Sequence, residues 1–170
     1  RVNIKTQEFS QISFQDIKKF CRFIRSHYLR GGGAKYSPTD PQITTAFTNN
    51  EHPSYLTMYY SPRTLYGKTG ETVKNLEITG VISARSLTLT LGEERFPVYY
   101  VDNLCVHPDH RRKGIAPKLI QTHHYDTRYK RPQIKVHLFK REGDMTAIVP
   151  LVAYFTHMYV LPELRRVGLP

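Results

Sequence analysis

The stretch NLCVHPDHRRKGIAPKLI, residues 103–120, decides how this chain folds. It begins as an apolar run, turns at Pro108, becomes strongly basic, passes through a single glycine and returns to an apolar pattern with helical spacing. An apolar run bounded by turn residues is typical of a buried strand, and apolar residues three and four apart are typical of a helix that packs on a sheet. We therefore expect a strand that ends near Val106, a basic loop, and a helix over 116–129.

The strand that leads into this stretch does not alternate regularly. Val101, Leu104 and Val106 are its natural core residues, but Val101 and Leu104 lie three positions apart. Because successive side chains of a strand point to opposite faces, regular pairing cannot bury both. A β-bulge at Asp102–Asn103 would restore a shared face and would leave backbone groups without a partner. We predict such a bulge, with the strand over 133–140 diverging just beyond it and a ligand lying in the gap.

The basic loop opens the predicted helix. The first four N–H groups of a helix have no intrahelical acceptor, and the helix dipole is positive at that end. Gly114 would let the backbone approach a bulky anion, and Arg111, Arg112 and Lys113 add positive charge. Neither the GxxxxGK(S/T) loop nor the dinucleotide-binding GxGxxG pattern is present. We therefore predict a cradle for a diphosphate; the alternative is a solvated basic turn before a helix.

Further strands and helices are predicted around this unit. A Ser13–Asp16 capping box followed by apolar residues at helical spacing predicts a helix over 13–29. Its apolar face would contain Phe14, Ile17, Phe20, Cys21, Ile24 and Tyr28. Glycines and prolines predict a loop over 30–42, and a turn-rich surface excursion is expected over 61–75. Strands are expected over 2–9, 54–60, 76–92 (one long or two short), 96–106 and 133–139, and a last helix over 150–160.

The order of these elements is β, α, loop, three β, α, β, α. Three antiparallel-looking strands followed by a β-α-β unit indicate an α/β fold with a mixed sheet and helices on its faces. At 170 residues the chain suits one domain, which we place at 1–170, with 159–170 as a linker or tail. Because the first residue is Arg1 rather than Met, we expect the sequence to be part of a longer chain.

The composition favours some classes of partner over others. There are 25 Lys and Arg residues against 14 Asp and Glu, a net charge of +11, which favours nucleic acid, an anionic membrane surface or a phosphate-rich cofactor. No apolar run approaches the ~18 residues of a spanning helix, and nothing resembles a signal peptide. Cys21, Cys105 and the eight histidines show no metal spacing. We therefore expect a reduced, cytoplasmic protein without a bound metal.

The pattern Arg111-x-x-Gly114-x-Ala116 after VDNLCVHP resembles the acyl-CoA signature of the GCN5-related N-acyltransferase (GNAT) superfamily. Within it, the sequence is most similar to the N-terminal half of eukaryotic N-myristoyltransferase. The similar segments are LCVH, APKLI, TGVISA at 79–84, HYLRGGGAKYSP at 27–38 and YVLPE at 159–163. The resemblance implies a mostly antiparallel GNAT-like sheet, splayed at an acyl-CoA slot, with helices on both faces.

The resemblance also implies roles for single residues. The backbone of Leu104, Cys105 and Val106 would pair with the pantetheine arm. The amides of Asn103 and Leu104 would face the thioester oxygen, where such donors typically raise the rate ~10²–10³-fold. The pyrophosphate would be held at the loop and helix start by Arg112, Lys113, Gly114, Ile115 and Ala116. Arg111 and Lys118 would reach the outer phosphate.

Several residues are candidates for proton transfer. Asp102 is the nearest carboxylate and the first candidate for the general base; the alternative is a bulge residue that bonds its own backbone. Glu77 is a further candidate, with a solvated charge at a strand edge as the alternative. Tyr154 stands where superfamily members often place a tyrosine that reprotonates the leaving thiolate; the alternative is a core aromatic. Cys105 has no partner typical of a nucleophile, so we expect direct transfer without a covalent enzyme intermediate.

These observations lead to three functional hypotheses. The first is an acyl-CoA-dependent N-acyltransferase similar to N-myristoyltransferase, which uses myristoyl-CoA or acetyl-CoA to acylate a protein or peptide amine such as an N-terminal glycine. The second is a GNAT N-acetyltransferase that uses acetyl-CoA on an amine or lysine, with a shallower apolar pocket. The third is an inactive fold that binds nucleic acid through its basic surface. We expect no specific nucleic-acid partner, because RRKGIA accounts for much of the charge; an anionic membrane is a further candidate for peripheral contact.

Overall fold

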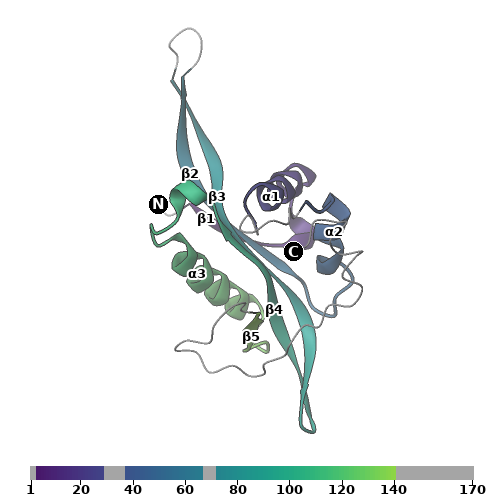
Figure 1. Cartoon of the computed structure of the whole chain (residues 1–170). Helices are drawn as coiled ribbons and strands as arrows, with labels where there is room; N and C mark the ends of the chain where they lie inside the picture. Colours follow the sequence, from purple (N-terminus) through teal and green to yellow (C-terminus); the bar gives the residue numbers. More distant parts are fainter. Residues whose placement is uncertain (1–2, 29–36, 67–71, 141–170) are drawn as a thin grey trace, which may run out of the picture.

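The computed structural model describes residues 3–28, 37–66 and 72–140. These residues form one five-stranded sheet in the order β1-β2-β3-β4-β5 (Figure 1). The strands are β1 (Ile4–Glu8), β2 (Tyr55–Tyr66), β3 (Thr72–Leu91), β4 (Glu94–Val106) and β5 (His137–Phe139). The first four pair antiparallel, and β5 runs parallel to β4. The predicted mixed, mostly antiparallel α/β sheet is confirmed.

Helices cover both faces of this sheet, as predicted (Figure 1). One face carries α1 (Phe14–His27) and α2 (Asp40–Thr44), and the other carries α3 (Ile115–Lys130). Three short 3₁₀ turns connect elements: η1 (Phe9–Gln11), η2 (Thr45–Phe47) and η3 (Pro108–His110). None of the helices among the described residues has the length and apolar character needed to cross a membrane.

Each face of the sheet has its own apolar cluster. On the α1 face, Phe20 and Ile24 share a fully buried cluster with Met58 of β2. On the other face, Ile115 and Leu119 pack at the sheet so closely that a Cβ on Gly80 of β3 would lie 2.9 Å from an atom of each. The glycine therefore sets how near α3 can approach the sheet.

The start of α1 lies where the capping pattern predicts it. Ser13 Oγ accepts a hydrogen bond from the Asp16 N–H at 3.2 Å and donates to the Asp16 carboxylate at 2.9 Å. The predicted apolar face is confirmed for Phe20, Cys21 and Ile24, which are buried. It is wrong for Phe14, which is 73% exposed, because this first helical residue lies beside Lys18 at the surface instead of over the sheet.

The turn-rich excursion predicted over 61–75 is largely a β-hairpin. β2 continues to Tyr66 and pairs with β3 from Thr72 onward, and the two strands project from the body of the sheet (Figure 1). β1 pairs only with residues 55–59 of β2, so Pro62 lies where the missing N–H breaks no bond to β1. β3 is one long strand, which resolves the alternative that the sequence left open.

Two other elements differ from the prediction. α2 begins inside the predicted loop over 30–42 and ends two residues beyond it. Its signal was present, since Thr39 and Gln42 form a capping box. β5 is shorter than the predicted strand and pairs with β4 over three residues. The helix predicted over 150–160, its Tyr154 and the tail over 159–170 lie outside the described residues. The single-domain boundary therefore stays a prediction.

Candidate active site

β4 contains the predicted bulge. Its register with β3 shifts by one residue, because Ser83 pairs with Asn103 and Ala84 pairs with Val101. Asp102 is the extra residue. Val101, Leu104 and Val106 consequently share the α3 face, as predicted. Val101 and Val106 are partly buried beside the Ile82–Ile115–Leu119 cluster, but the prediction of a core position is wrong for Leu104, which is exposed.

Backbone hydrogen bonds on either side of the bulge show the same insertion independently. The N–H of Tyr99 donates to Val136 on the β5 side at 2.9 Å, whereas the N–H of His107 donates to Thr79 of β3 at 2.9 Å. In a regular strand, residues eight apart direct their N–H groups to the same side. The opposite directions require one inserted residue. Past the bulge, alternation therefore directs the backbone groups of Leu104 and Val106 away from β3.

The pairing between β4 and β5 ends at the bulge. Its last pair is Val101 with Phe139, and within the described ranges no strand pairs with 102–106 on that side. A cavity of about 440 Å³ lies here, which we call the α3-side cavity. Leu104, which is 37% exposed, forms part of its wall. The other lining residues are Tyr28, Ile82, Val101, Asp102, Ile120, His123, His124, His137, Phe139 and Lys140.

The residues after the bulge divide between the cavity and the core. The Val106 carbonyl accepts a hydrogen bond from Arg111 Nε at 3.3 Å, so the first loop arginine lies over the end of the strand. Cys105 points into the α1-face cluster, where burial raises the pKa of its thiol to about 11. The side chain of Asn103 is also buried and donates to Ser83 Oγ at 3.0 Å. The backbone groups of Leu104 and Val106, which were predicted to meet a ligand, are on the open side of β4. Those of Asn103 and Cys105, which were also predicted to do so, face β3.

Asp102 is held by a cation rather than by the bulge backbone. Arg85 Nε of β3 donates to both carboxylate oxygens, at 3.0 and 3.1 Å. Burial raises the pKa of Asp102, and the Arg85 guanidinium opposes that rise. The Asp102 carbonyl accepts a hydrogen bond from the Tyr28 hydroxyl at 3.3 Å. The end of α1 therefore reaches the same residue that interrupts the β4 ladder.

The basic loop has the backbone geometry of a close turn. Gly114 has a φ of +72° and is the N-cap of α3. Apart from its two chain neighbours, no residue that the structure describes has an atom within 4 Å of where a Cβ would stand. Arg112 has a φ of +60°, a conformation that side-chain-bearing residues rarely adopt. The N–H of Lys118 donates to Gly114 at 3.4 Å, and Pro117 has no N–H, so the N–H groups of 115 and 116 have no intrahelical acceptor.

Three histidines on the wall of the α3-side cavity were not predicted as site residues. His123 Nδ1 lies 2.8 Å from Thr57 Oγ1, and its buried Nε2 has no hydrogen-bond partner among the described residues. Burial lowers the pKa of His123 to about 3 and that of His137 to about 4. His124 Nδ1 lies 3.1 Å from His137 Nδ1. Leu119, His123 and Thr127 are spaced four residues apart and share one buried face of α3. This spacing in the sequence would have indicated that His123 is buried.

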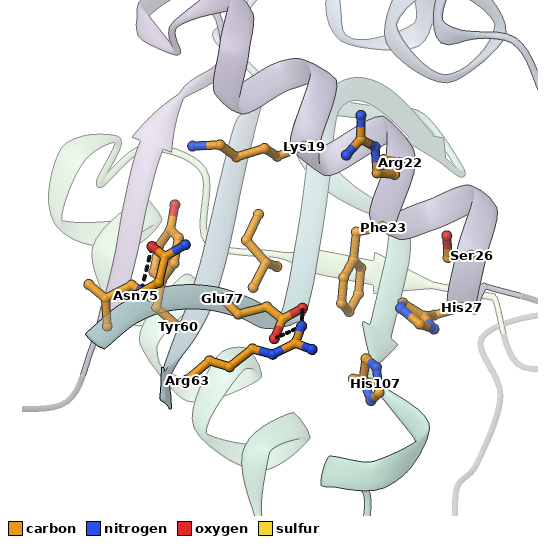
Figure 2. A pocket seen from close by; sticks show the side chains of 12 residues that line it. Lys19, Arg22, Phe23, Ser26, His27, Tyr60, Arg63, Asn75, Glu77 and His107 are labelled. Atoms are coloured by element: carbon orange, nitrogen blue, oxygen red, sulfur yellow. Dashed lines mark hydrogen bonds and ion pairs between the residues drawn. The ribbon is translucent and has the colours of Figure 1, made fainter. Parts of the chain in front are cut away.

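A second cavity, of about 470 Å³, lies on the opposite face, and we call it the α1-side cavity (Figure 2). It lies between α1 and the projecting parts of β2 and β3, and His107 closes one end. Glu77, a candidate base from the sequence, lines this cavity and pairs with Arg63. Across the described ranges, no three His, Cys, Asp or Glu side chains are grouped so that they could hold a metal ion.

Comparisons with known proteins agree with this geometry. A family described as acetyltransferase (GNAT) domain matches residues 42–139. The solved aminoglycoside 6'-N-acetyltransferase of Acinetobacter haemolyticus aligns with a TM-score of 0.56 and 16% identity, covering 92% of this chain and 99% of that one. The ribosomal-protein-alanine N-acetyltransferase of Brucella melitensis biovar Abortus aligns with a TM-score of 0.54 and 17% identity, covering 93% and 100%. At these identities the likeness is one of fold. No curated protein matches significantly.

Proposed function

The chain belongs to the acetyltransferase (GNAT) domain family, and we propose that it transfers an acetyl group directly from acetyl-CoA to an amine at the bulge of β4. The observation that carries the proposal is the change of backbone direction at Asp102. It leaves the backbone groups of Leu104 and Val106 on the open side of β4, where Leu104 lines the α3-side cavity and the Val106 carbonyl accepts a hydrogen bond from Arg111 of the loop before Gly114. A CoA thioester needs those two features, hydrogen bonds along its pantetheine arm and a cradle for its pyrophosphate.

The residues present fit such a substrate. The backbone amides and carbonyls of Leu104 and Val106 are two residues apart along an unpaired strand edge. An extended arm that contains amides can therefore pair with them as a neighbouring strand would. Around Gly114, N–H groups without intrahelical acceptors, the positive helix end and the exposed Arg112 and Lys113 favour a diphosphate. The open space beside Gly114 leaves room for phosphate oxygens.

The same residues assign the steps of the transfer. The N–H of Leu104 donates to the thioester oxygen, where negative charge develops, and a single donor of this kind typically contributes ~10²–10³ in rate. Asp102 takes the proton of the attacking amine. As the C–N bond forms, the C–S bond of the thioester breaks and CoA leaves as its thiolate, which takes up a proton from solvent. Arg85 keeps its carboxylate oriented, and burial keeps it more basic than an exposed aspartate. Because the Cys105 thiol is buried and protonated, we assign the acyl group to no enzyme nucleophile.

The acyl chain length and the acceptor are the finer parts of the proposal. The family match favours acetyl-CoA, and nothing in the comparisons points to N-myristoyltransferase specifically. Myristoyl-CoA is therefore the second candidate, supported by the apolar side chains of Leu104, Ile120 and Phe139 around the cavity. We propose a peptide or protein amine as the acceptor and the cytoplasm as the location.

Native mass spectrometry of the full chain with acetyl-CoA, myristoyl-CoA and free CoA in parallel tests cofactor class and chain length together. We expect one molecule of acetyl-CoA per chain, with free CoA bound comparably and myristoyl-CoA no more tightly. Preferential binding of myristoyl-CoA would replace the acetyl assignment by the myristoyl one. Absence of all three, combined with salt-sensitive binding to random DNA, would overturn the proposal in favour of the nucleic-acid hypothesis.

A further inference from the structure

The α1-side cavity has a predominantly basic wall that the proposed acetyl transfer does not use. Basic side chains from three parts of the fold line it: Lys19, Arg22 and His27 of α1, Arg63 of β2, and His107 after β4 (Figure 2). Glu77 is the one carboxylate among its described lining residues. A cavity with this excess of cations selects anionic groups by simple electrostatics.

Lys19 and Arg63 already have an anionic neighbour among the described residues, and Arg22 does not. Arg63 Nη1 donates to both oxygens of Glu77, at 3.0 and 3.1 Å, and Lys19 Nζ donates to Asp16 at 2.9 Å. Arg22 is exposed and makes no hydrogen bond or ion pair with any residue that the structure describes. A planar guanidinium without a partner matches a carboxylate in a bidentate geometry.

The floor of the cavity is apolar. Phe23 and Ile78 are buried beneath the charged rim, and Tyr60 is half-buried beside them. The volume of about 470 Å³ lies within the usual range of ligand pockets, ~300–1,000 Å³. The ligand would therefore combine a negative group with an uncharged stem, as an acidic side chain on a peptide does.

The cavity is also within reach of the bulge. His107 follows Asp102 by five residues, about 16 Å at the strand rise of ~3.3 Å per residue. His27 lines the cavity, and its neighbour Tyr28 bonds the Asp102 carbonyl. A peptide whose amine lies at the bulge and which passes the end of α1, clear of the strand edge that pairs with pantetheine, would span this distance in about five residues.

We infer that the α1-side cavity binds an acidic side chain of a peptide or protein acceptor, about five residues from the acylated amine, with Arg22 as its anchor. The acceptor part of this inference rests on the proposed function. The net charge of +11 supports it, because such a chain attracts acidic acceptors and repels polycationic ones.

Acetyl transfer to three peptides, identical except for Glu, Gln or Lys at positions four to six, tests the inference. With acetyl-CoA and the full chain, we expect the KM of the Glu peptide to be about tenfold below that of the Gln peptide, with kcat little changed. Arg22→Glu should abolish the preference and Arg22→Gln should weaken it. Arg95→Glu should keep it, because this exposed residue is the second of β4. The hairpin of β3 and β4 lies at the opposite end of the sheet from that of β2 and β3 (Figure 1).

Equal KM values for the three peptides, with acetyl transfer intact, would overturn the inference and leave the proposed function standing. If the chain neither binds CoA nor transfers acetyl groups, the proposed function fails instead. Fluorescence anisotropy with the same labelled peptides then still tests the cavity: Arg22-dependent binding of the Glu peptide supports the site, and its absence rejects it. Full competition by inorganic phosphate at micromolar concentration would also overturn the assignment to a carboxylate.

Discussion

The two cavities beside the end of β4 have similar volumes, about 440 Å³ on the α3 side and about 470 Å³ on the α1 side, but their walls differ in charge. The α3-side cavity has apolar residues, histidines whose pKa values are lowered by burial, and backbone groups released by a bulge. The α1-side cavity has arginine and lysine side chains at its rim. The end of β4 thus lies between two different sites. The α3-side cavity presents backbone groups, and the α1-side cavity presents charged side chains.

This difference indicates how the two cavities should respond to change. Backbone groups and neutral side chains distinguish ligands by shape and hydrogen bonding. Binding to them therefore depends little on salt concentration and strongly on local backbone conformation. Exposed charged side chains distinguish ligands by the sign of their charge. Binding to them therefore depends on salt concentration, and they can be substituted without unfolding the protein. The predictions below test this contrast, beginning with the largest expected effect.

Gly114→Glu should weaken CoA binding at least about a thousandfold, roughly 4 kcal/mol, because it places a carboxylate where phosphates are expected. Isothermal titration calorimetry with CoA measures the loss. Gly92→Glu is the matched control, because Gly92 has a similar φ of +61° and equally open surroundings at the β3–β4 turn. Gly114→Ala isolates the backbone strain. Unchanged CoA affinity in Gly114→Glu would mean that the cradle lies elsewhere.

Asp102→Asn should lower kcat for acetyl transfer about a hundredfold, the usual scale for losing a general base. The acidic limb of the pH–rate profile should disappear with it. Glu94→Gln removes an exposed carboxylate from the start of the same strand and should leave both unchanged. A kcat within twofold of the native value would remove Asp102 from the mechanism and leave it a structural partner of Arg85.

Acidification from pH 7 to pH 5.5 should lower the free energy of unfolding by roughly 2 kcal/mol. In the folded chain, burial lowers the pKa values of His123 and His137 to about 3 and about 4, whereas in the unfolded chain both return to about 6.5. The unfolded state therefore binds more protons between those limits, and stability falls as the pH falls. The cationic partners of Asp16 and Asp40 lower the pKa values of these carboxyls. Their contribution to stability is therefore lost only at a pH below this window.

Urea denaturation at pH 7, 6 and 5.5 measures this dependence. His137→Phe should reduce the slope by about half, because it removes one of the two groups while keeping a ring in place. If the native chain has the same free energy of unfolding at pH 7 and 5.5, the histidines of the α3-side cavity are not held neutral, and the contrast with the α1-side cavity weakens.

The Arg63–Glu77 pair should contribute less than about 1 kcal/mol to stability, since its side chains are 60% and 47% exposed and solvent screens their attraction. A double-mutant cycle with Arg63→Gln and Glu77→Gln, followed by thermal unfolding, measures the coupling. A small value shows that the rim of the α1-side cavity can vary without loss of the fold. A coupling above 2 kcal/mol would make this rim part of the structural core.

The unit around the bulge of β4 could be predicted from local sequence patterns alone. The three-residue spacing of Val101 and Leu104, the basic loop and the helix after Gly114 are local patterns, and the structure confirms the bulge, the α3 helix and the end of pairing with β5. The cap of α1 was equally local. Such features are readable because alternation, turn residues and capping depend on neighbours within a few positions.

The side-chain contacts across the sheet, in contrast, became visible only in the folded structure. Arg85 reaches Asp102 over 17 positions, and Thr57 reaches His123 over 66. The part of β2 and β3 that walls the α1-side cavity likewise extends past Pro62, beyond the first residue of β1, and only the strand register shows this. These contacts follow from strand register and helix placement, which are set by long-range packing, and no local pattern in the sequence encodes them.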